Sequence, residues 1–300
     1  MANILVIGSL NTDYVISVDK IVSKGETILG HSSEKHFGGK GANQAVALAR
    51  LGASVTMIGA VGDDQEGRAL KSALKTEGID VSHIQSIDTP SGKAFIQRTK
   101  DDNAIVVAPG ANTAFDLDLD SIDFTRYDML VLQNEISHAL NRKIIEKAHE
   151  LDVKVLYNPA PAIKTNHTLL EKIDILVLNE SEAALITGIQ TDSKARIENA
   201  LRTLYDRVKE AVILTRGANG ASYAFDGLFH HLRAYTVDVL DTTGSGDSSV
   251  AGLAYSLIKG KNMNECVNFA QKCGALAATK KGAQPSLPTL EEVLETKLLK

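Results

Sequence analysis

The sequence predicts an α/β fold in which helices cover both faces of a mostly parallel central sheet, with a small β-sheet lid beside it. Short apolar runs typical of buried parallel strands alternate with helical patterns along the chain. Two β-rich stretches with no helical period, near residues 12–37 and 91–108, stand apart from this alternation. The chain shows no linker, internal repeat or low-complexity segment, so we expect residues 1–300 to form a single domain.

Composition narrows the class of protein. The 300 residues are 44% apolar and 23% charged, as in soluble globular proteins. The net charge of −5 argues against a broad surface for nucleic acid or anionic membranes. There is neither a signal-peptide pattern nor an apolar run long enough to cross a bilayer, so we expect a cytoplasmic protein. Cys266 and Cys273 are spaced about 10 Å apart along a helix, too far for a disulfide, and the eight histidines show no metal-ligand spacing.

The first strand leads to polar residues at the edge where open α/β sheets bind ligands. Residues 3–8 are an apolar run ending in glycine, typical of a buried parallel strand, and Asn11 and Asp13 follow its carboxyl end. A carboxylate and an amide at this place can hold neighbouring hydroxyls of a polyol. An Asx-type turn explains the pair equally well.

The predicted lid consists of four short β segments. Residues 14–18 and 27–32 are separated by Gly25, and residues 92–99 and 103–108 flank a turn at Asp101 and Asp102. Because these segments lack the helical period of their surroundings, we expect them to form a sheet outside the main one.

Between the two lid stretches, residues 37–47 combine a glycine-rich entry with the start of a helix. Its small residues predict close packing on a neighbouring element. The glycines would expose backbone N–H groups to a ligand, with Lys40 and Asn43 as side-chain donors. Tight helix packing alone also explains such a glycine cluster.

The remaining elements continue the alternation. We predict strands at residues 55–61, 129–132, 153–157, 175–178 and 212–215, and helices at 66–74, 140–151, 183–187 and 266–279. Residues 222–225 and 229–235 predict a hairpin. Polar residues follow two of the strands, Gln133 and Glu135 after one and Asn158 after the next.

Two further strand ends have both a structural and a functional interpretation. Asn179 and Glu182 have the spacing of a capping box, or else Glu182 orders water around Mg²⁺ while Asn179 meets a phosphate. The loop from Thr215 to Gly220 suits a tight turn under a nucleotide, or the turn that precedes the hairpin.

The most informative stretch runs from Asp241 to Gly252. Two glycines flank Ser245, and an apolar stripe that ends at Ile258 follows, so a flexible turn opens a helix. Free N–H groups at such a helix start bind anions, and Asp247 lies in the first turn. Asp247 is therefore either a helix cap or a general base beside an anion hole formed by the local amides.

Five separated motifs together carry a family resemblance. No Gly-x-x-x-x-Gly-Lys-Ser/Thr sequence occurs, which excludes a P-loop protein, and no Gly-x-Gly-x-x-Gly follows the first strand, which disfavours a nicotinamide oxidoreductase. Instead, the chain resembles the ribokinase family of carbohydrate kinases along its whole length, at residues 37–45, 158–162, 179–183, 241–247 and 281–286. The resemblance implies a three-layer α/β/α fold of ribokinase type.

The resemblance also implies roles for individual residues. Asp247 is similar to the catalytic base, with Gly244, Ser245 and Gly246 as the anion hole. The positions similar to sugar-contacting ones are Asn11, Asp13, Gly39, Lys40, Gly41, Asn43, Glu135 and Asp247. Those similar to nucleotide-contacting ones are Asn179, Thr215, Arg216, Gly217, Asn219, Gly220, Gly246 and Gln271. Glu182 matches an Mg²⁺ motif, and the positions that match a K⁺ site are Asp241, Thr243, Ala277, Lys280, Gly282 and Ser286.

Two residues depart from the family's pattern. Alanine is usual where Ser245 stands, and serine is small enough to keep the turn. Phenylalanine is usual where Ser249 stands, so we expect different packing under the site and a changed affinity for the nucleotide.

We therefore expect an ATP-dependent kinase, with Mg²⁺ and K⁺, that phosphorylates the 5-hydroxyl of D-ribose. In similar enzymes the lid segments pair across a homodimer. The sequence leaves open the same reaction on 2-deoxyribose, a hexose or a nucleoside. It also leaves open a catalytically silent sugar-binding regulator, for which the missing aromatic at Ser249 is the one indication.

Overall fold

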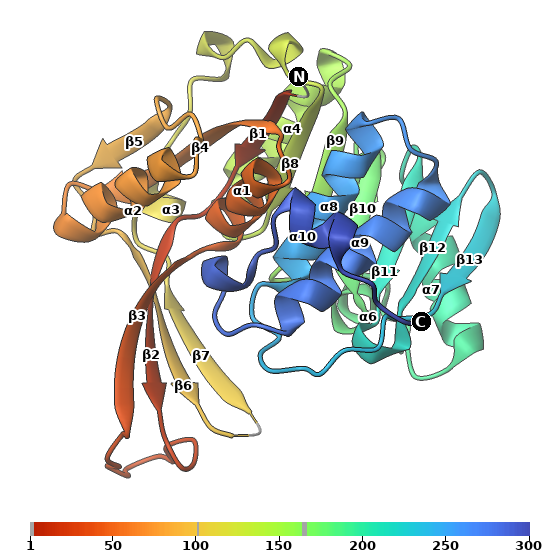
Figure 1. Cartoon of the computed structure of the whole chain (residues 1–300). Coiled ribbons are helices and arrows are strands. Elements are labelled where there is room, and N and C mark those ends of the chain that lie inside the picture. The colour runs from red at the N-terminus through yellow and green to blue at the C-terminus, as the bar shows by residue number, and fades with distance from the viewer. Residues whose placement is uncertain (1–2, 101, 164–166) are drawn as a thin grey trace.

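A nine-stranded sheet forms the body of the protein, and a separate four-stranded sheet projects from it (Figure 1). The computed structural model describes residues 3–100, 102–163 and 167–300. The large sheet contains, in spatial order, β13 (Leu228–Leu232), β12 (Ala221–Phe225), β11 (Ala211–Thr215), β10 (Ile175–Asn179), β9 (Val155–Asn158), β8 (Met129–Gln133), β1 (Asn3–Ile7), β4 (Ser54–Gly62) and β5 (Ile84–Ile87). The small sheet contains β3 (Ser32–Gly38), β2 (Asn11–Ser17), β6 (Gly92–Arg98) and β7 (Asn103–Ala108).

Every pairing from β11 to β5 in the large sheet is parallel, and β12 and β13 add an antiparallel edge. Ile4 at the centre of the sheet, for example, pairs with Val55 on one side and Met129 on the other. The prediction of a mostly parallel sheet is confirmed. Because the strands are parallel, their carboxyl ends meet at one edge, where open sheets bind ligands.

Helices cover both faces of this sheet, and two hydrophobic cores result. In β1, Ile4 and Val6 point into one core, and Leu5 and Ile7 point into the other. The first core is completed by α1 (Lys40–Arg50), α2 (Gln65–Thr76), α8 (Ser245–Ile258), α9 (Met263–Ala278) and α10 (Leu290–Glu295). The second is completed by α3 (Ala111–Ala114), α4 (His138–Glu150), α5 (His167–Leu170), α6 (Glu180–Thr187) and α7 (Lys194–Tyr205). Short 3₁₀ turns are η1 (Leu119–Ser121), η2 (Phe124–Arg126), η3 (Gly217–Asn219) and η4 (Gln284–Ser286).

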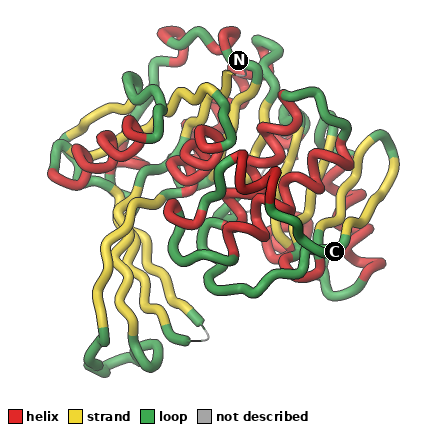
Figure 2. Tube along the Cα trace, viewed as in Figure 1, coloured by secondary structure: helices red, strands yellow, loops and turns green. Residues whose placement is uncertain are grey.

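The small sheet is the predicted lid, built of strands and loops (Figure 2). Its central strands β2 and β6 are parallel, whereas β3 and β7 pair antiparallel at the edges. The hairpin predicted at residues 92–99 and 103–108 is confirmed as β6 and β7. Its predicted turn includes Asp101, which lies outside the described residues.

One prediction about the lid, the strand at residues 27–32, is wrong, and the alternative interpretation of Asn11 and Asp13 is excluded. Residues 27–31 form no strand, and the partner of β2 is β3, whose polar residues are held in strand form by pairing with β2 along its whole length. Asn11 and Asp13 lie within β2, so the Asx-type turn is excluded. Strand β5 and helices α3, α5, α7 and α10 have no counterpart among the predicted elements. Among the described residues, no helix is both long and apolar enough to span a membrane.

Candidate active site

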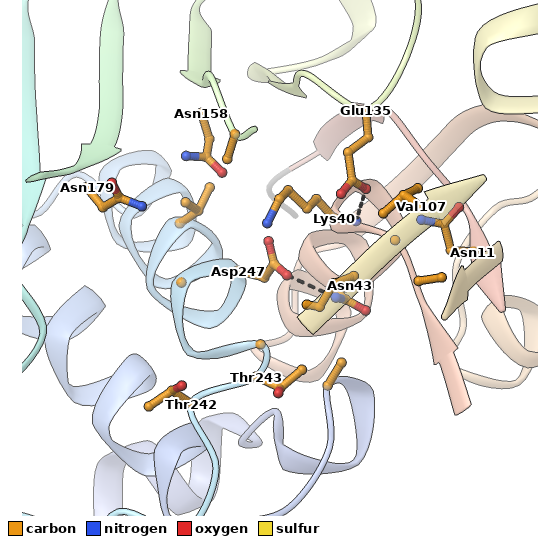
Figure 3. Close-up of a pocket in the computed structure, with 18 of the residues that line it drawn as sticks. Asn11, Lys40, Asn43, Val107, Glu135, Asn158, Asn179, Thr242, Thr243 and Asp247 are labelled. Carbon is orange, nitrogen blue, oxygen red and sulfur yellow. Dashed lines mark hydrogen bonds between the residues drawn. The ribbon is translucent and has the colours of Figure 1, made fainter. Parts of the chain in front are cut away.

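A cleft of about 330 Å³ lies where the carboxyl edge of the large sheet, the start of α8 and the lid meet (Figure 3). β2 contributes Asn11 and Asp13, α1 contributes Lys40 and Asn43, and α8 contributes Asp247. The lid closes one side with apolar side chains that include Val107. The cleft therefore combines charged groups on its floor with an apolar cover.

Asp247 lies in the first turn of α8, but its side chain does not cap the helix. Its Oδ2 accepts a hydrogen bond from Asn43 Nδ2 (2.9 Å), and its Oδ1 accepts one from Gln44 Nε2 (3.0 Å). The helix cap is Gly244, which has no side chain to offer. The interpretation of Asp247 as a capping residue is therefore wrong, because the carboxylate is turned towards α1.

The surroundings of Asp247 have opposite effects on its affinity for a proton. The residue is 7% exposed, and burial raises the pKa of its carboxyl group above the ordinary value. The charge on Lys40 and the hydrogen bonds from Asn43 and Gln44 lower that pKa in part. A buried carboxylate with a raised pKa beside a cleft has the properties of a general base.

The turn before α8 brings backbone amides to the cleft. Gly244 has φ 78°, a left-handed conformation that favours glycine. A Cβ atom there would also lie 3.1 Å from the carbonyl oxygen of Ala283. The N–H of Ser245 donates to the carbonyl of Thr242 (3.1 Å), so an anion at this helix start would compete with that bond for this amide.

Asn11 and Asn43 face the cleft with opposite hydrogen-bonding groups. Asn11 Oδ1 accepts from Asn112 Nδ2 (2.7 Å), which leaves the Asn11 amide nitrogen for a ligand. Asn112 is itself held by the backbone N–H of Leu10 (2.9 Å). Asn43 Nδ2 donates a hydrogen bond to Asp247, and the buried Oδ1 of Asn43 has no partner among the described residues. One side chain therefore offers a donor and the other an acceptor, as neighbouring hydroxyls require.

Carboxylates surround Lys40. Glu135 accepts from Ser9 Oγ (2.5 Å) and from the backbone N–H of Lys40 (2.9 Å). Burial works to lower the pKa of the Lys40 amine, but Asp247, Glu135 and other carboxylates outweigh it and raise that pKa. Burial, together with Glu135, raises the pKa of Asp13 to about 7. The cleft therefore holds a fixed cation that a phosphate could contact.

A second cavity, of about 550 Å³, adjoins the first at the start of α8. Thr215, Thr242 and Gly246 line both cavities. Its other lining residues include Gly217, Gly220, Tyr235, Val237, Val239, Ser249 and Gln271. A largely apolar cavity that opens onto an amide-rich turn suits a flat base joined to phosphates.

Three residues lie outside both cavities, although the family resemblance assigns them to contact with the sugar or the nucleotide. Arg216 pairs with Glu180 (2.9 Å), and Asn219 lies in η3. Gly41 packs against the chain just after β1, since a Cβ atom there would lie 2.6 Å from the carbonyl carbon of Gly8. Gly41 therefore has a packing role. Arg216 and Asn219 belong to the loop from Thr215 to Gly220, whose other residues line the second cavity.

The capping box at Asn179 and Glu182 is confirmed. Asn179 Oδ1 accepts from the N–H of Glu182 (2.8 Å), and Glu182 Oε2 accepts from the N–H of Asn179 (2.8 Å). Both residues also line the first cavity. Burial raises the pKa of Glu182. The structural interpretation is therefore correct, and a functional role would have to share these side chains with the cap.

The positions assigned to K⁺ form a network beside Gly244. Asp241 accepts from the N–H (2.9 Å) and Oγ1 (2.6 Å) of Thr243 and from the N–H of Gly282 (2.9 Å). Burial works to raise the pKa of Asp241, but these hydrogen bonds outweigh it and lower that pKa. Ser286 Oγ contacts the carbonyl of Thr243 (3.4 Å). Farther along, the carbonyl of Ala277 accepts from the N–H of Lys280 (3.1 Å), and the Lys280 amine pairs with Glu292 (2.5 Å).

Two residues that the sequence did not single out contact the candidate residues. Gln44 donates a hydrogen bond to Asp247, and Asn112 donates one to Asn11. Gln44 follows Asn43 on α1, but it meets Asp247 across 203 positions of sequence, and no local pattern indicates that contact. Asn112 reaches Asn11 across 101 positions of sequence, and no local pattern points to it. In the part of the chain that the structure describes, no group of three or more His, Cys, Asp or Glu side chains is arranged to hold a metal ion.

The chain is similar to known carbohydrate kinases in both sequence and structure. The profile of the pfkB family carbohydrate kinases matches residues 1–290. The chain is 38% identical over 295 residues to a ribokinase of Haemophilus influenzae, covering 97% of this chain and 96% of that protein. It is 31% identical over 299 residues to a deoxyribokinase of Salmonella typhi, covering 98% of both. The solved structure of Arabidopsis thaliana ribokinase complexed with ribose and ATP is similar at a TM-score of 0.90 and 30% identity, covering 98% of both chains.

Proposed function

The chain belongs to the pfkB family of carbohydrate kinases, and from that premise we propose that it transfers the γ-phosphate of ATP to the 5-hydroxyl of D-ribose, with residues 1–300 acting as one kinase domain. The observation that carries the proposal is the placement of Asp247. Its buried carboxylate stands at an amide-rich helix start, where a polar cleft meets a largely apolar cavity. The likeness to ribokinases over almost the whole chain supports ribose as the acceptor.

In this mechanism Asp247 accepts the proton of the sugar hydroxyl. The hydroxyl oxygen forms a bond to the γ-phosphorus while the bond between that phosphorus and the β,γ-bridging oxygen breaks, and ADP leaves. The amides near Gly244 and Gly246, with the Lys40 amine, stabilise the charge on the transferring group. A positioned base of this kind contributes about 10²–10⁴-fold to the rate.

The sugar would lie between the lid and α1. The carboxylates of Asp13 and Glu135 and the Asn43 oxygen accept hydrogen bonds from ring hydroxyls, and Asn11 donates to one. The apolar lid residues exclude water from the hydroxyl that reacts. Gly39 supplies backbone at the start of α1. The nucleotide base would occupy the second cavity, against Gly217, Gly220 and Gln271, with Thr215 and Asn179 nearer its phosphates.

The residues present fit an Mg²⁺ ion that is held mainly by nucleotide phosphates and water. Glu182 would accept hydrogen bonds from that water, which agrees with the few protein ligands that Mg²⁺ usually takes. When bound, Mg²⁺ neutralises charge on the phosphates. K⁺ would take oxygen ligands from the set Asp241, Thr243, Ala277, Lys280, Gly282 and Ser286, because the Asp241 carboxylate and the Thr243 carbonyl are hard oxygen donors that suit such a cation.

We also propose that the lid pairs with the lid of a second copy. Phe95 and Val106 face each other across β6 and β7, on the opposite lid face from the cleft-lining Ile105, and both are exposed. Exposed apolar residues on a short projecting sheet are typical of an association surface. Light scattering of the purified chain should give a dimer mass, and Val106→Lys should give a monomer. A monomeric wild type would contradict the pairing.

A coupled ADP-release assay over ribose, 2-deoxyribose, a hexose and a nucleoside, with and without K⁺, tests the function. We expect the highest kcat/KM with ribose and a higher rate with K⁺. A higher kcat/KM with 2-deoxyribose than with ribose would instead indicate a deoxyribokinase, which is the name of the Salmonella relative. Ribose binding by calorimetry without ADP release would instead indicate a silent sugar-binding regulator.

A further inference from the structure

Gln44 lies on α1 and contacts the carboxylate of Asp247. The Gln44 side chain is wholly buried, and its Nε2 donates to Asp247 Oδ1 (3.0 Å) and to Asn158 Oδ1 (3.2 Å). Its Oε1 accepts from Gln133 Nε2 (2.7 Å). We propose that Gln44, oriented by Gln133, is a positioning residue that holds the Asp247 carboxylate in place to accept the substrate proton. The inference rests on the proposed function of Asp247 as the base.

The neighbours of Gln44 determine which way its amide points. A glutamine amide has one acceptor atom and one group with two donor hydrogens. Gln133 occupies the acceptor, so both hydrogens of Nε2 are left for Asp247 and Asn158. Reversing the Gln44 amide would place its oxygen against the Asp247 carboxylate, which can only accept hydrogen bonds when ionised, and buried groups do not tolerate such a contact.

Gln133 is wholly buried at the end of β8, where its backbone carbonyl accepts from Asn141 Nδ2 (2.6 Å). Its side-chain Oε1 has no hydrogen-bond partner among the described residues, so its side chain is held by burial and by the hydrogen bond to Gln44. Gly8 gives it room, because a Cβ atom at that position would lie 2.0 Å from Gln133 Oε1. The hydrogen bond from Gln133 therefore ties Gln44 to the end of β8, next to the residue that follows β1.

Asn43 and Gln44 are consecutive residues of α1, and each holds one oxygen of the same carboxylate. Asp247 is on α8, which packs beside α1. Two hydrogen bonds from one helix fix the plane of a carboxylate on another, and such preorganisation is what a base needs. Asn43 also lines the cleft, whereas Gln44 does not, so Gln44 acts through the cleft residues that it holds, Asp247 and Asn158.

The charged groups that face Asp247 come from several elements. They are Lys40 on α1, Glu135 after β8, Asp13 on β2 and Glu182 on α6. A change at Gln44 leaves all four in place. Gln44→Met removes a hydrogen bond that lowers the pKa of Asp247. The pKa of Asp247 should therefore rise further in this variant.

The test compares Gln44→Met with Ser248→Ala. Ser248 is buried beside Asp247 and donates to the carbonyl of Cys273 (3.0 Å), so its variant loses a hydrogen bond that does not involve the carboxylate. For Gln44→Met we expect an unchanged Kd for ribose, kcat about tenfold lower at pH 7, and the acidic limb of the kcat profile about 1 pH unit higher. Ser248→Ala should keep the wild-type profile. A Gln44→Met profile that matches the wild type would overturn the proposal.

A second readout does not depend on activity. Titration of the Asp247 carboxyl carbon by ¹³C NMR, with its signal assigned by its loss in Asp247→Asn, should show a midpoint about 1 pH unit higher in Gln44→Met than in the wild type. An unchanged midpoint would overturn the role of Gln44. If the wild type phosphorylates no sugar, the proposed function fails, and this titration still decides whether Gln44 controls the carboxylate.

Gln133→Met covers the case in which Gln44→Met does not fold, as judged by circular dichroism. This variant leaves Gln44 in place and removes the donor that orients it. Both the kinetic limb and the NMR midpoint should move in the same direction by a smaller amount. No movement in either would overturn the proposal.

Discussion

Asp13→Asn should stabilise the protein and weaken its binding of sugar. Asp13 is 9% exposed, and burial, with the nearby charges of Glu135 and Asp247, raises its pKa from 3.8 to about 7. The folded state therefore binds the Asp13 proton more tightly than the unfolded state does. The resulting stability is fully present below pH 3.8 and is lost as the pH rises towards 7.

The size of this effect follows from the two pKa values. Each pKa unit corresponds to about 1.4 kcal/mol, so ionised Asp13 costs about 4 kcal/mol of folding free energy at pH 8. At pH 5 the folded carboxyl is mostly protonated, and the cost falls to about 1.5 kcal/mol. Because asparagine has no charge to bury, Asp13→Asn should increase the free energy of unfolding, and the two costs given above are upper limits for that increase. Loss of a charged acceptor should weaken sugar binding about tenfold or more.

Urea unfolding at pH 5 and pH 8 measures this difference, with Asp64→Asn as the matched control. Asp64 accepts from the N–H groups of Gly67 (2.7 Å) and Ser91 (2.8 Å), and although burial works to raise its pKa, hydrogen bonds keep that pKa below its usual value. The same substitution should therefore destabilise the protein at Asp64. Asp13→Asn less stable than the wild type at pH 8, or equally stabilised at both pH values, would refute the reasoning.

Two further substitutions test the surroundings of the cleft. Asn112→Leu removes the donor that orients Asn11, so steady-state kinetics should show KM for the sugar raised several-fold with kcat nearly unchanged, and an unchanged KM would contradict this orientation. A Cβ atom in Gly274→Ala would lie 2.2 Å from Ser249 Oγ and 3.0 Å from the carbonyl of Ser245, so KM for ATP should rise, and adding Ser249→Ala should recover part of the loss. A double variant no better than Gly274→Ala would show that the contact with Ser249 is unimportant.

The elements that the sequence predicted well have local signals. Residues 129–132 and 175–178 are continuous apolar runs, and both are buried parallel strands in the large sheet. Helix α7 also has such a signal, because Ile197, Leu201 and Leu204 recur on one buried face. The periodicity of these residues is therefore sufficient to predict the helix from the sequence.

Other features depend on contacts that no local pattern encodes. Strand β3 is mostly polar and exposed, and its strand form comes from pairing with β2. The contact between Gln44 and Asp247 spans 203 positions, so the residue behind the base could not be found from its neighbours in sequence. Asp247 itself was ambiguous for the same reason, since a helix cap and a buried base have the same local sequence.

The most direct test of the proposed chemistry compares ribose binding with turnover in Asp247→Asn. The substitution keeps the size of the side chain and removes its capacity to accept a proton. We expect the Kd for ribose, measured by calorimetry, to stay within about threefold of the wild type while kcat falls about 10³-fold. Turnover close to that of the wild type would contradict the assignment of Asp247 as the base.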